Sequence, residues 1–275
     1  MKASRIWHSR TMAAVMDDNH LWFRRFHPNT EASVRLVCFP HAGGAATFYF
    51  PTSRALGPAV EVLAVQYPGR QDRRAERCVD DLRELAGLIV AELRPWCDRP
   101  LALFGHSMGA TVAYEVARRL ERDGTPPLGL FASGRRAPSI NRDESVHLRD
   151  DQDIVRELRK LSGTDAALLV DEEMLTMVLP AVRGDYRAAE TYRHGGGPEL
   201  NRPICVLVGD SDPVTSLAEA WAWDRHTTVG CRVEVFPGGH FFLRAEAEGV
   251  HRAILRHLGE WSAGDPPARV VTAQA

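Results

Sequence analysis

The sequence predicts an α/β protein in which helices flank a mainly parallel sheet. Two observations favour this class. Six short runs are almost continuously apolar, as are strands that helices cover on both faces, and segments with helical periodicity separate most of these runs. The apolar runs are "VRLVCF", "VEVLAVQY", "LALFG", "LGLFAS", "ICVLVG" and "CRVEVF".

The helical segments between the strands show apolar residues on one face. In "VDDLRELAGLIVAELRPW" that face carries Leu82, Leu85, Ala86, Ile89, Val90 and Leu93. The stretch 137–202 differs, because it has helical patterns and no convincing strand. A helical insertion there would form a lid over the carboxyl ends of the strands, where open α/β folds bind their ligands.

Length and composition indicate a globular protein. The chain has 275 residues, of which 44% are hydrophobic and 25% charged. We expect a single domain over 21–262 with the lid at about 137–202. A flexible leader at 1–20 and a flexible tail at 263–275 would flank this domain, and a monomer is the default expectation.

Charge and apolar runs exclude several function classes. A net charge of −2 gives no footprint for nucleic acid, and the apolar runs are too short to span a membrane. The leader lacks the apolar segment of a signal peptide. No pair of the five cysteines has CxxC spacing, so neither a zinc site nor a redox motif is supported. We therefore expect a reduced, cytoplasmic protein without a metal.

The pentapeptide "GHSMG" places Ser107 between a predicted strand and a predicted helix. This context and the flanking Gly105 and Gly109 fit the G-x-S-x-G nucleophile elbow of α/β hydrolases, whose tight turn leaves no room for larger side chains. The alternative is an idle serine in a small-residue packing turn.

A serine nucleophile needs a base, and in α/β hydrolases the base follows it in the chain. His240 in "FPGGHFF" is the candidate, because it lies in a loop directly after a predicted strand. His226, His251 and His257 fall in helical patterns instead.

The base needs an acid that orients it. Asp210 and Asp212 both follow the strand "ICVLVG". Asp212 is favoured, since Pro213 would open the next turn and leave Asp212 at the loop tip, whereas Asp210 would bond to the turn itself. Asp143 is a more distant third candidate.

Two backbone amides would stabilise the oxyanion of the reaction. One is the amide of Met108, directly after the serine and at a helix N-terminus. The other is the amide of Ala42 in the loop "FPHAGGAATFYF". His41 would brace this loop, and His106 would pack beneath the elbow.

Several motifs together resemble the type II thioesterases, the stand-alone α/β hydrolases that accompany polyketide and nonribosomal peptide synthases. The motifs are "VCFPHAGGAATFYF", "VQYPGRQDR", "LFGHSMGA", "LPAVRGDYRAAETY", "PICVLVGDSDP" and "FPGGHFFL". The resemblance runs from about Trp22 to Trp261 and agrees in the order and spacing of the motifs.

The resemblance implies the triad Ser107, Asp212 and His240 and oxyanion donors at Ala42 and Met108. It also implies a substrate, an acyl thioester on the phosphopantetheine arm of an acyl or peptidyl carrier protein, and an editing role that removes aberrant or stalled acyl units. No cofactor is expected, because the phosphopantetheine enters with the substrate. The alternatives are a medium-chain fatty acyl thioesterase and a general carboxylesterase, or a binding protein that keeps the scaffold without catalysis.

Two further groups are candidates for substrate and partner contacts. In the lid, Met174, Met177 and Val178 would line an acyl chamber, or else only pack the lid onto the sheet. Five arginines that follow strand ends would steer an acidic carrier protein, or else form a solvated charge cluster. These arginines are Arg70, Arg73, Arg74, Arg135 and Arg136.

Overall fold

The computed structural model describes residues 21–161, 172–264 and 271–273, and within them eight strands form one sheet. In spatial order the strands are β1 (Phe23–Arg24), β3 (Glu61–Val65), β2 (Arg35–Phe39), β4 (Leu101–His106), β5 (Leu130–Ser133), β6 (Ile204–Gly209), β7 (Cys231–Phe236) and β8 (Val271–Ala273). Only the β1–β3 pair among these is antiparallel. The predicted mainly parallel sheet is confirmed, and all six apolar runs are strands.

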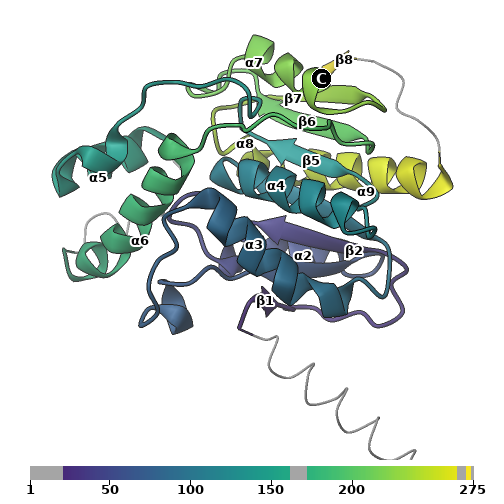
Figure 1. The fold of residues 1–275 in the computed structure, drawn as a ribbon, viewed down its shortest axis with the longest axis horizontal. Coiled ribbons are helices and arrows are strands. Elements are labelled where there is room, and N and C mark those ends of the chain that lie inside the picture. Colours follow the sequence, from purple (N-terminus) through teal and green to yellow (C-terminus); the bar gives the residue numbers. More distant parts are fainter. Residues whose placement is uncertain (1–20, 162–171, 265–270, 274–275) are drawn as a thin grey trace, which may run out of the picture.

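Helices cover both faces of this sheet (Figure 1). α3 (Leu82–Leu93) and α4 (Met108–Arg122) contribute to one apolar core, while α2 (Phe50–Leu56) and α9 (Ala247–Ala263) contribute to a second. Alternate residues of the strands belong to the two cores, as the pleat requires. Strands β2 to β6 are therefore buried along their whole length, which explains why they read as continuous apolar runs.

Parallel pairing brings the loops after the strands to one edge of the sheet. In the register Phe39 lies opposite Gly105, His106 opposite Ser133, and Gly209 opposite Phe236. The loops that begin at Pro40, Ser107, Gly134, Asp210 and Pro237 consequently start side by side. All of the predicted triad and oxyanion residues lie in or next to these loops.

A helical insertion leaves the sheet after β5 and returns at β6. It contains η4 (Val146–Leu148), α5 (Asp151–Leu161) and α6 (Glu172–Thr191), and no strand lies among its described residues, as predicted for 137–202. The insertion has a small apolar core of its own, made by Val146, Ile154, Val155, Leu158, Leu179 and Val182. In Figure 1 the arrowheads of β2 and β5 point toward the side on which α5 and α6 stand.

Short elements complete the chain: η1 (Ala46–Tyr49), η2 (Gln71–Arg73), η3 (Arg94–Trp96), α7 (Leu217–Trp221), η5 (Ala222–His226) and α8 (Phe242–Ala245). The predicted leader, 1–20, lies outside the described residues. In the part of the chain that the structure describes, no helix is long and apolar enough to cross a membrane.

The structure describes two parts of the tail expected at 263–275, and both have regular contacts. Ala263 ends α9, and Gly264 follows it in the left-handed conformation (φ 81°) that commonly ends a helix. Val271–Ala273 then pair in parallel with Val233–Val235 of β7. The outer edge of β7 would otherwise present unpaired backbone groups, and β8 satisfies them.

Candidate active site

A strained turn carries Ser107 between β4 and α4. Ser107 has φ 54° and ψ −122°, a backbone conformation that residues with a side chain rarely adopt. Its N–H donates a hydrogen bond of 2.8 Å to the carbonyl oxygen of Ser133 on the neighbouring strand. The structure therefore has the strand–turn–helix context predicted for "GHSMG", in which the turn lifts the serine out of the sheet.

The two glycines of the motif are required by close backbone approaches. A Cβ atom on Gly105 would lie 2.1 Å from the carbonyl oxygen of Gly109, and a Cβ on Gly109 would lie 2.1 Å from the carbonyl oxygen of Phe39. Both distances are far below van der Waals contact. The elbow is thus packed backbone against backbone between β4, α4 and the end of β2.

The structure places His240 against Asp212, on the loops after β7 and β6. His240 Nδ1 lies 2.9 Å from Asp212 Oδ2, and the two side chains are 2% and 0% exposed. The second carboxylate oxygen of Asp212 accepts a hydrogen bond of 2.9 Å from the N–H of Val214. With a proton on Nδ1 held by the carboxylate, the lone pair of His240 is on Nε2, where it can act as a base.

The competing acids have other contacts. Asp210 is exposed, and its Oδ1 accepts hydrogen bonds from the N–H of Gly238 (3.0 Å) and the hydroxyl of Ser211 (2.9 Å). These bonds, the one from Gly238 above all, lower the pKa of Asp210. Asp143 is exposed in the loop after β5. The preference for Asp212 over Asp210 therefore agrees with the geometry, and Asp210 bonds to the turn as expected.

Ser107 opens into a cavity of about 170 Å³ that His240, Ala42 and Met108 also line. Met108 is the first residue of α4, so its N–H has no acceptor within the helix and is free to bind an anion. Ala42 belongs to the loop after β2. The structure thus brings the predicted nucleophile, base and oxyanion residues to one cavity, with Asp212 behind the base.

A buried ion pair that sequence reasoning missed holds the Ala42 loop. Asp185 of α6 accepts two bonds from Arg70, at 2.6 and 2.9 Å, and a third of 2.7 Å from the N–H of Gly43. Arg70 also donates a bond of 3.1 Å to the carbonyl oxygen of Gly44. Arg70 and Asp185 therefore clamp the residues that follow Ala42 from two sides. The aspartate lies in "RGDYRAAETY", a motif of the resemblance, but nothing in its spacing shows what it contacts.

Two buried histidines surround the base without carrying charge. Burial, followed by the charge of His240, lowers the pKa of His41 to about 3 and that of His106 well below its ordinary value. The His41 ring packs against Phe48 and Phe241, at 4.6 and 4.8 Å between ring centroids. His106 Nδ1 lies 3.0 Å from Ser133 Oγ beneath the elbow. Both brace the site, as the sequence predicted, and both are neutral at pH 7.

The structure does not bring the predicted acyl-chamber residues Met177 and Val178 to the cavity at Ser107. Met177, which is 54% exposed, and Val178 line a second cavity of about 630 Å³ and not the one at Ser107. The side chain of Met174 lies outside the described residues. The next turns of α6 and the end of α5 face Ser107 instead, so the cavity there is lined by Leu158, Leu161, Tyr186 and Ala189. The helical spacing in "DIVRELRKL" was the signal that could have found the two leucines.

The prediction of an arginine cluster that steers a partner is wrong for three of its five members. Arg70 is buried against Asp185. Arg73 is also buried; it pairs with Glu76 and packs on the ring of Trp22. The third is Arg136, which is buried against Glu144. Of the other two members, Arg135 is half-buried at the cavity and Arg74 is exposed. Strand-end arginines here serve the fold more than the surface.

Comparison with known proteins identifies the family. The family model described as the thioesterase domain matches residues 34–261. The chain belongs to the thioesterase family. It is 50% identical over 256 residues to thioesterase PikA5 of Streptomyces venezuelae, and this alignment covers 92% of this chain and 91% of that protein. It is 53% identical over 237 residues to the probable cadicidin biosynthesis thioesterase of Streptomyces griseus, and this alignment covers 86% of this chain and 66% of that protein.

A solved structure agrees. The type II thioesterase BorB from the borrelidin biosynthetic cluster superposes with a TM-score of 0.82 at 49% identity, covering 86% of this chain and 98% of that one. The resemblance to type II thioesterases drawn from the sequence motifs is confirmed. The fold is an α/β-hydrolase fold, and the thioesterase is a serine hydrolase that cleaves thioesters.

The other histidines of the thioesterase belong to the fold. His226 is buried, with Nε2 2.9 Å from Ser139 Oγ and Nδ1 3.2 Å from the hydroxyl of Tyr114. Burial, followed by the charges of His194 and Arg118, lowers its pKa to about 4. His251 lies 3.3 Å from Thr52 Oγ1, between α9 and α2. Neither residue lines the cavity at Ser107.

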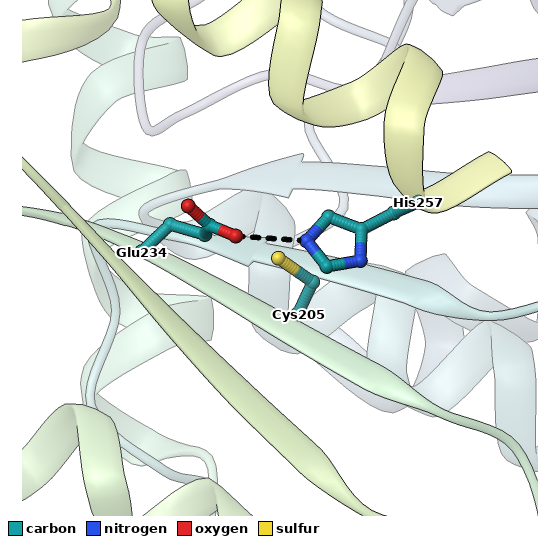
Figure 2. Close-up of side chains that lie close together, drawn as sticks. All are labelled: Cys205, Glu234 and His257. Atoms are coloured by element: carbon teal, nitrogen blue, oxygen red, sulfur yellow. Dashed lines mark hydrogen bonds and ion pairs between the residues drawn. The ribbon is translucent and has the colours of Figure 1, made fainter. Parts of the chain in front are cut away.

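His257 belongs to a buried cluster with Glu234 and Cys205, shown in Figure 2. Their ligand atoms lie within 4.8 Å of one another, a spacing that a metal ion would allow. However, the Glu234 oxygen that faces His257 (3.0 Å) also binds the guanidinium of Arg256, whose charge opposes a cation. Burial raises the pKa of the Cys205 thiol well above its usual range, so the thiolate that metals require is disfavoured. We interpret Glu234 as the shared partner of Arg256 and His257, which fixes α9 to β7.

Replacing Asp212 by Asn tests the acid. The amide keeps the shape but favours the wrong histidine tautomer, so kcat should fall by roughly 10³–10⁴-fold. Thioester hydrolysis by purified Asp212→Asn and wild-type enzyme measures this. Asp210→Asn is the matched control, and an equal loss in that variant would show that Asp212 is not the specific partner of His240.

Replacing Asp185 by Ala tests the clamp. The buried guanidinium of Arg70 would lose its partner, so the free energy of unfolding should fall by about 3–5 kcal/mol. The kcat should fall as well at temperatures where the variant is fully folded, because the Ala42 loop is released. Glu84→Gln, which breaks an exposed ion pair with Arg77, should cost less than about 1 kcal/mol. Unchanged kcat in folded Asp185→Ala would contradict the positioning role.

Replacing His226 by Gln tests the burial of a neutral imidazole. The folded pKa of about 4 lies below the ordinary 6.5, so between these values only the unfolded chain binds the proton. Stability therefore falls as the pH falls through this window, by up to about 1.4 kcal/mol per pH unit for this residue. The measurement is the free energy of unfolding in urea at several pH values between 6.5 and 5. Plotted against pH, this free energy should have a shallower slope in the variant than in the wild type. Identical slopes would mean that His226 does not titrate as its burial implies.

Proposed function

We propose that this thioesterase hydrolyses acyl thioesters from the phosphopantetheine arm of acyl or peptidyl carrier proteins. It would thereby remove aberrant or stalled acyl units from a polyketide or nonribosomal peptide synthase. The observation that carries the proposal is the small cavity at Ser107. The helical insertion forms part of its wall, and His240, held by Asp212, lines it beside the serine. The names of the relatives, which refer to biosynthesis of natural products, support this class of partner.

Apart from the substrate and the hydrolytic water, the mechanism uses only side chains and amides of this chain. Ser107 Oγ attacks the thioester carbonyl carbon while His240 Nε2 takes the hydroxyl proton, and the amides of Ala42 and Met108 stabilise the oxyanion. The C–S bond breaks, His240 returns the proton to the leaving thiolate, and an acyl ester remains on Ser107. A water that gives its proton to His240 then attacks the ester, and the acid leaves as Ser107 regains the proton. No step calls for a metal or redox cofactor.

The size of the cavity favours short acyl groups. A protein cavity of 150 Å³ holds about one benzene molecule, and the cavity at Ser107 measures about 170 Å³. An acyl chain of on the order of six non-hydrogen atoms therefore fits without any rearrangement. A medium-chain fatty acyl group exceeds this, which argues against the alternative of a medium-chain thioesterase.

The second cavity supports a route for the arm of the carrier protein. It lies beside the first, because His41 lines both, and it opens between the Ala42 loop and α6. Arg74 and Arg244 line it and supply positive charge for the phosphate of the arm and for an acidic carrier protein. In this proposal Met177 and Val178 contact the arm and not the acyl group. A monomer in the cytoplasm, with its five cysteines free, completes the proposal.

The test presents one butyryl group in three forms: on a holo carrier protein, on coenzyme A and as an aryl ester. We expect the highest kcat/KM with the carrier protein and loss of all three activities in Ser107→Ala. Octanoyl carrier protein, assayed in parallel, should react more slowly than the butyryl form because of the size of the cavity.

Three other results would contradict the proposal. A preference for the aryl ester would indicate a general carboxylesterase. A preference for the octanoyl group would indicate a medium-chain thioesterase. Equal inertness of wild type and Ser107→Ala on every substrate would indicate a protein that binds and does not hydrolyse.

A further inference from the structure

Arg135 lies at the wall of the acyl cavity. It follows Gly134, the first residue after the end of β5, and lines the same cavity as Ser107 and His240. The strand end lies close to the base, since a Cβ atom on Gly134 would lie 3.3 Å from His240 Cε1. Arg135 is thus a cavity residue, not a surface residue.

Few of its hydrogen-bond donors have a partner. Arg135 Nε donates a bond of 3.2 Å to Thr111 Oγ1, and Nη2 donates a long bond of 3.4 Å to the carbonyl oxygen of Ala189. A guanidinium has five N–H donors, so three remain beyond these two bonds. Arg135 lines both the cavity at Ser107 and a smaller neighbouring one that Thr111 and Ala189 also line. Within the described parts of the chain, no carboxylate lies at ion-pair distance from Arg135.

The carboxylates around the cavity are committed to other partners. Glu144 receives two bonds from Arg136, at 3.0 and 2.6 Å. Glu190 accepts the N–H groups of Val146 and His147 and contacts the His147 ring.

The last acidic residue at the wall, Glu157, lies 3.5 Å from Arg149.

Burial, followed by the charge of Arg136, lowers the pKa of Arg135 to about 10. The guanidinium therefore keeps its charge at neutral pH.

The position of Arg135 is fixed before any ligand binds. Its carbonyl oxygen accepts a bond of 2.7 Å from the indole N–H of Trp223, and its Nε is held at Thr111 in the first turn of α4. The spare donors of Arg135 are not sealed from solvent, since none of them is a fully buried unpaired atom, and a ligand that displaces this solvent has to supply the acceptor. The rest of the insertion's wall includes apolar side chains such as Leu158 and Leu161, which offer no such acceptor.

We propose that Arg135 binds an oxygen substituent of the acyl group, so that the enzyme selects acyl groups carrying a second oxygen beyond the thioester carbonyl. The inference rests on the proposed thioesterase function. A keto, hydroxyl or carboxylate oxygen shares the required chemistry, since each accepts hydrogen bonds from the guanidinium fork. A plain aliphatic acyl group of the same length leaves the donors without a partner, and sites of this kind discriminate strongly against such analogues.

The test compares acyl groups of matched length on one holo carrier protein. We would measure kcat/KM for butyryl, 3-hydroxybutyryl and 3-oxobutyryl groups, with malonyl as the carboxylate arm. In the wild type we expect at least one oxygenated group to exceed butyryl by about tenfold or more. The preferred arm identifies the oxygen chemistry. In Arg135→Met the ratio of that group to butyryl should fall to near one.

Further variants separate this role from a structural one. Arg135→Lys keeps the charge but loses the fork, so it should retain only part of the preference. Thr111→Val removes the anchor of Nε and should lower the ratio without removing the guanidinium. Arg77→Met, which removes an exposed arginine remote from the cavity, should leave the ratio unchanged. Melting temperatures confirm that each variant is folded, and Thr111→Val keeps the test available if Arg135→Met does not fold.

The outcomes are distinguishable. Hydrolysis of butyryl carrier protein with no preference for any oxygenated group overturns the role of Arg135 and leaves the proposed function standing. The same holds for a preference that survives in folded Arg135→Met. Failure of the wild type to hydrolyse any acyl carrier protein overturns the proposed function itself.

Discussion

The buried ion pair between Arg70 and Asp185 is the contact on which the site depends. It joins three segments far apart in the sequence: the loop after β3, the loop after β2 and helix α6. The sheet alone determines where the loops that carry Ser107, Asp212 and His240 begin, because parallel pairing aligns the strand ends. The Ala42 loop has no such template, and its backbone donors are held by a side chain that comes from the insertion.

This arrangement couples the insertion to the chemistry. α6 contributes Asp185 to the clamp and, on the same side, Tyr186 and Ala189 to the cavity wall. Gly43, which has φ 73°, would bring a Cβ atom within 2.7 Å of Val182, so the loop and the helix also touch directly. A displacement of α6 would therefore change the shape of the acyl cavity and the position of the oxyanion donors together.

The sequence predicted the parts of the molecule that follow from local pattern. Apolar runs and the "GHSMG" turn depend on neighbours in the chain, so all six long strands and the strained Ser107 follow from them. The choice of Asp212 over Asp210 depended on turn chemistry that Pro213 makes visible. Contacts across the fold have no such signature. Without the position of Asp185, the sequence indicates a surface charge at Arg70, and without the rotation of α6 it indicates an acyl-chamber residue at Met177, which lines the second cavity instead. The strand β8 was missed because edge pairing of a short segment leaves almost no periodicity.

The way in which the insertion joins the sheet has a consequence for how such enzymes diversify. Its two ends attach to β5 and β6, which are direct neighbours in the sheet. Helices can consequently be lengthened, shortened or exchanged between these two points without changing the register of any strand or the position of the triad. The shape of the acyl cavity can thus change while the triad stays in place, provided that Asp185 keeps its contacts with Arg70 and Gly43.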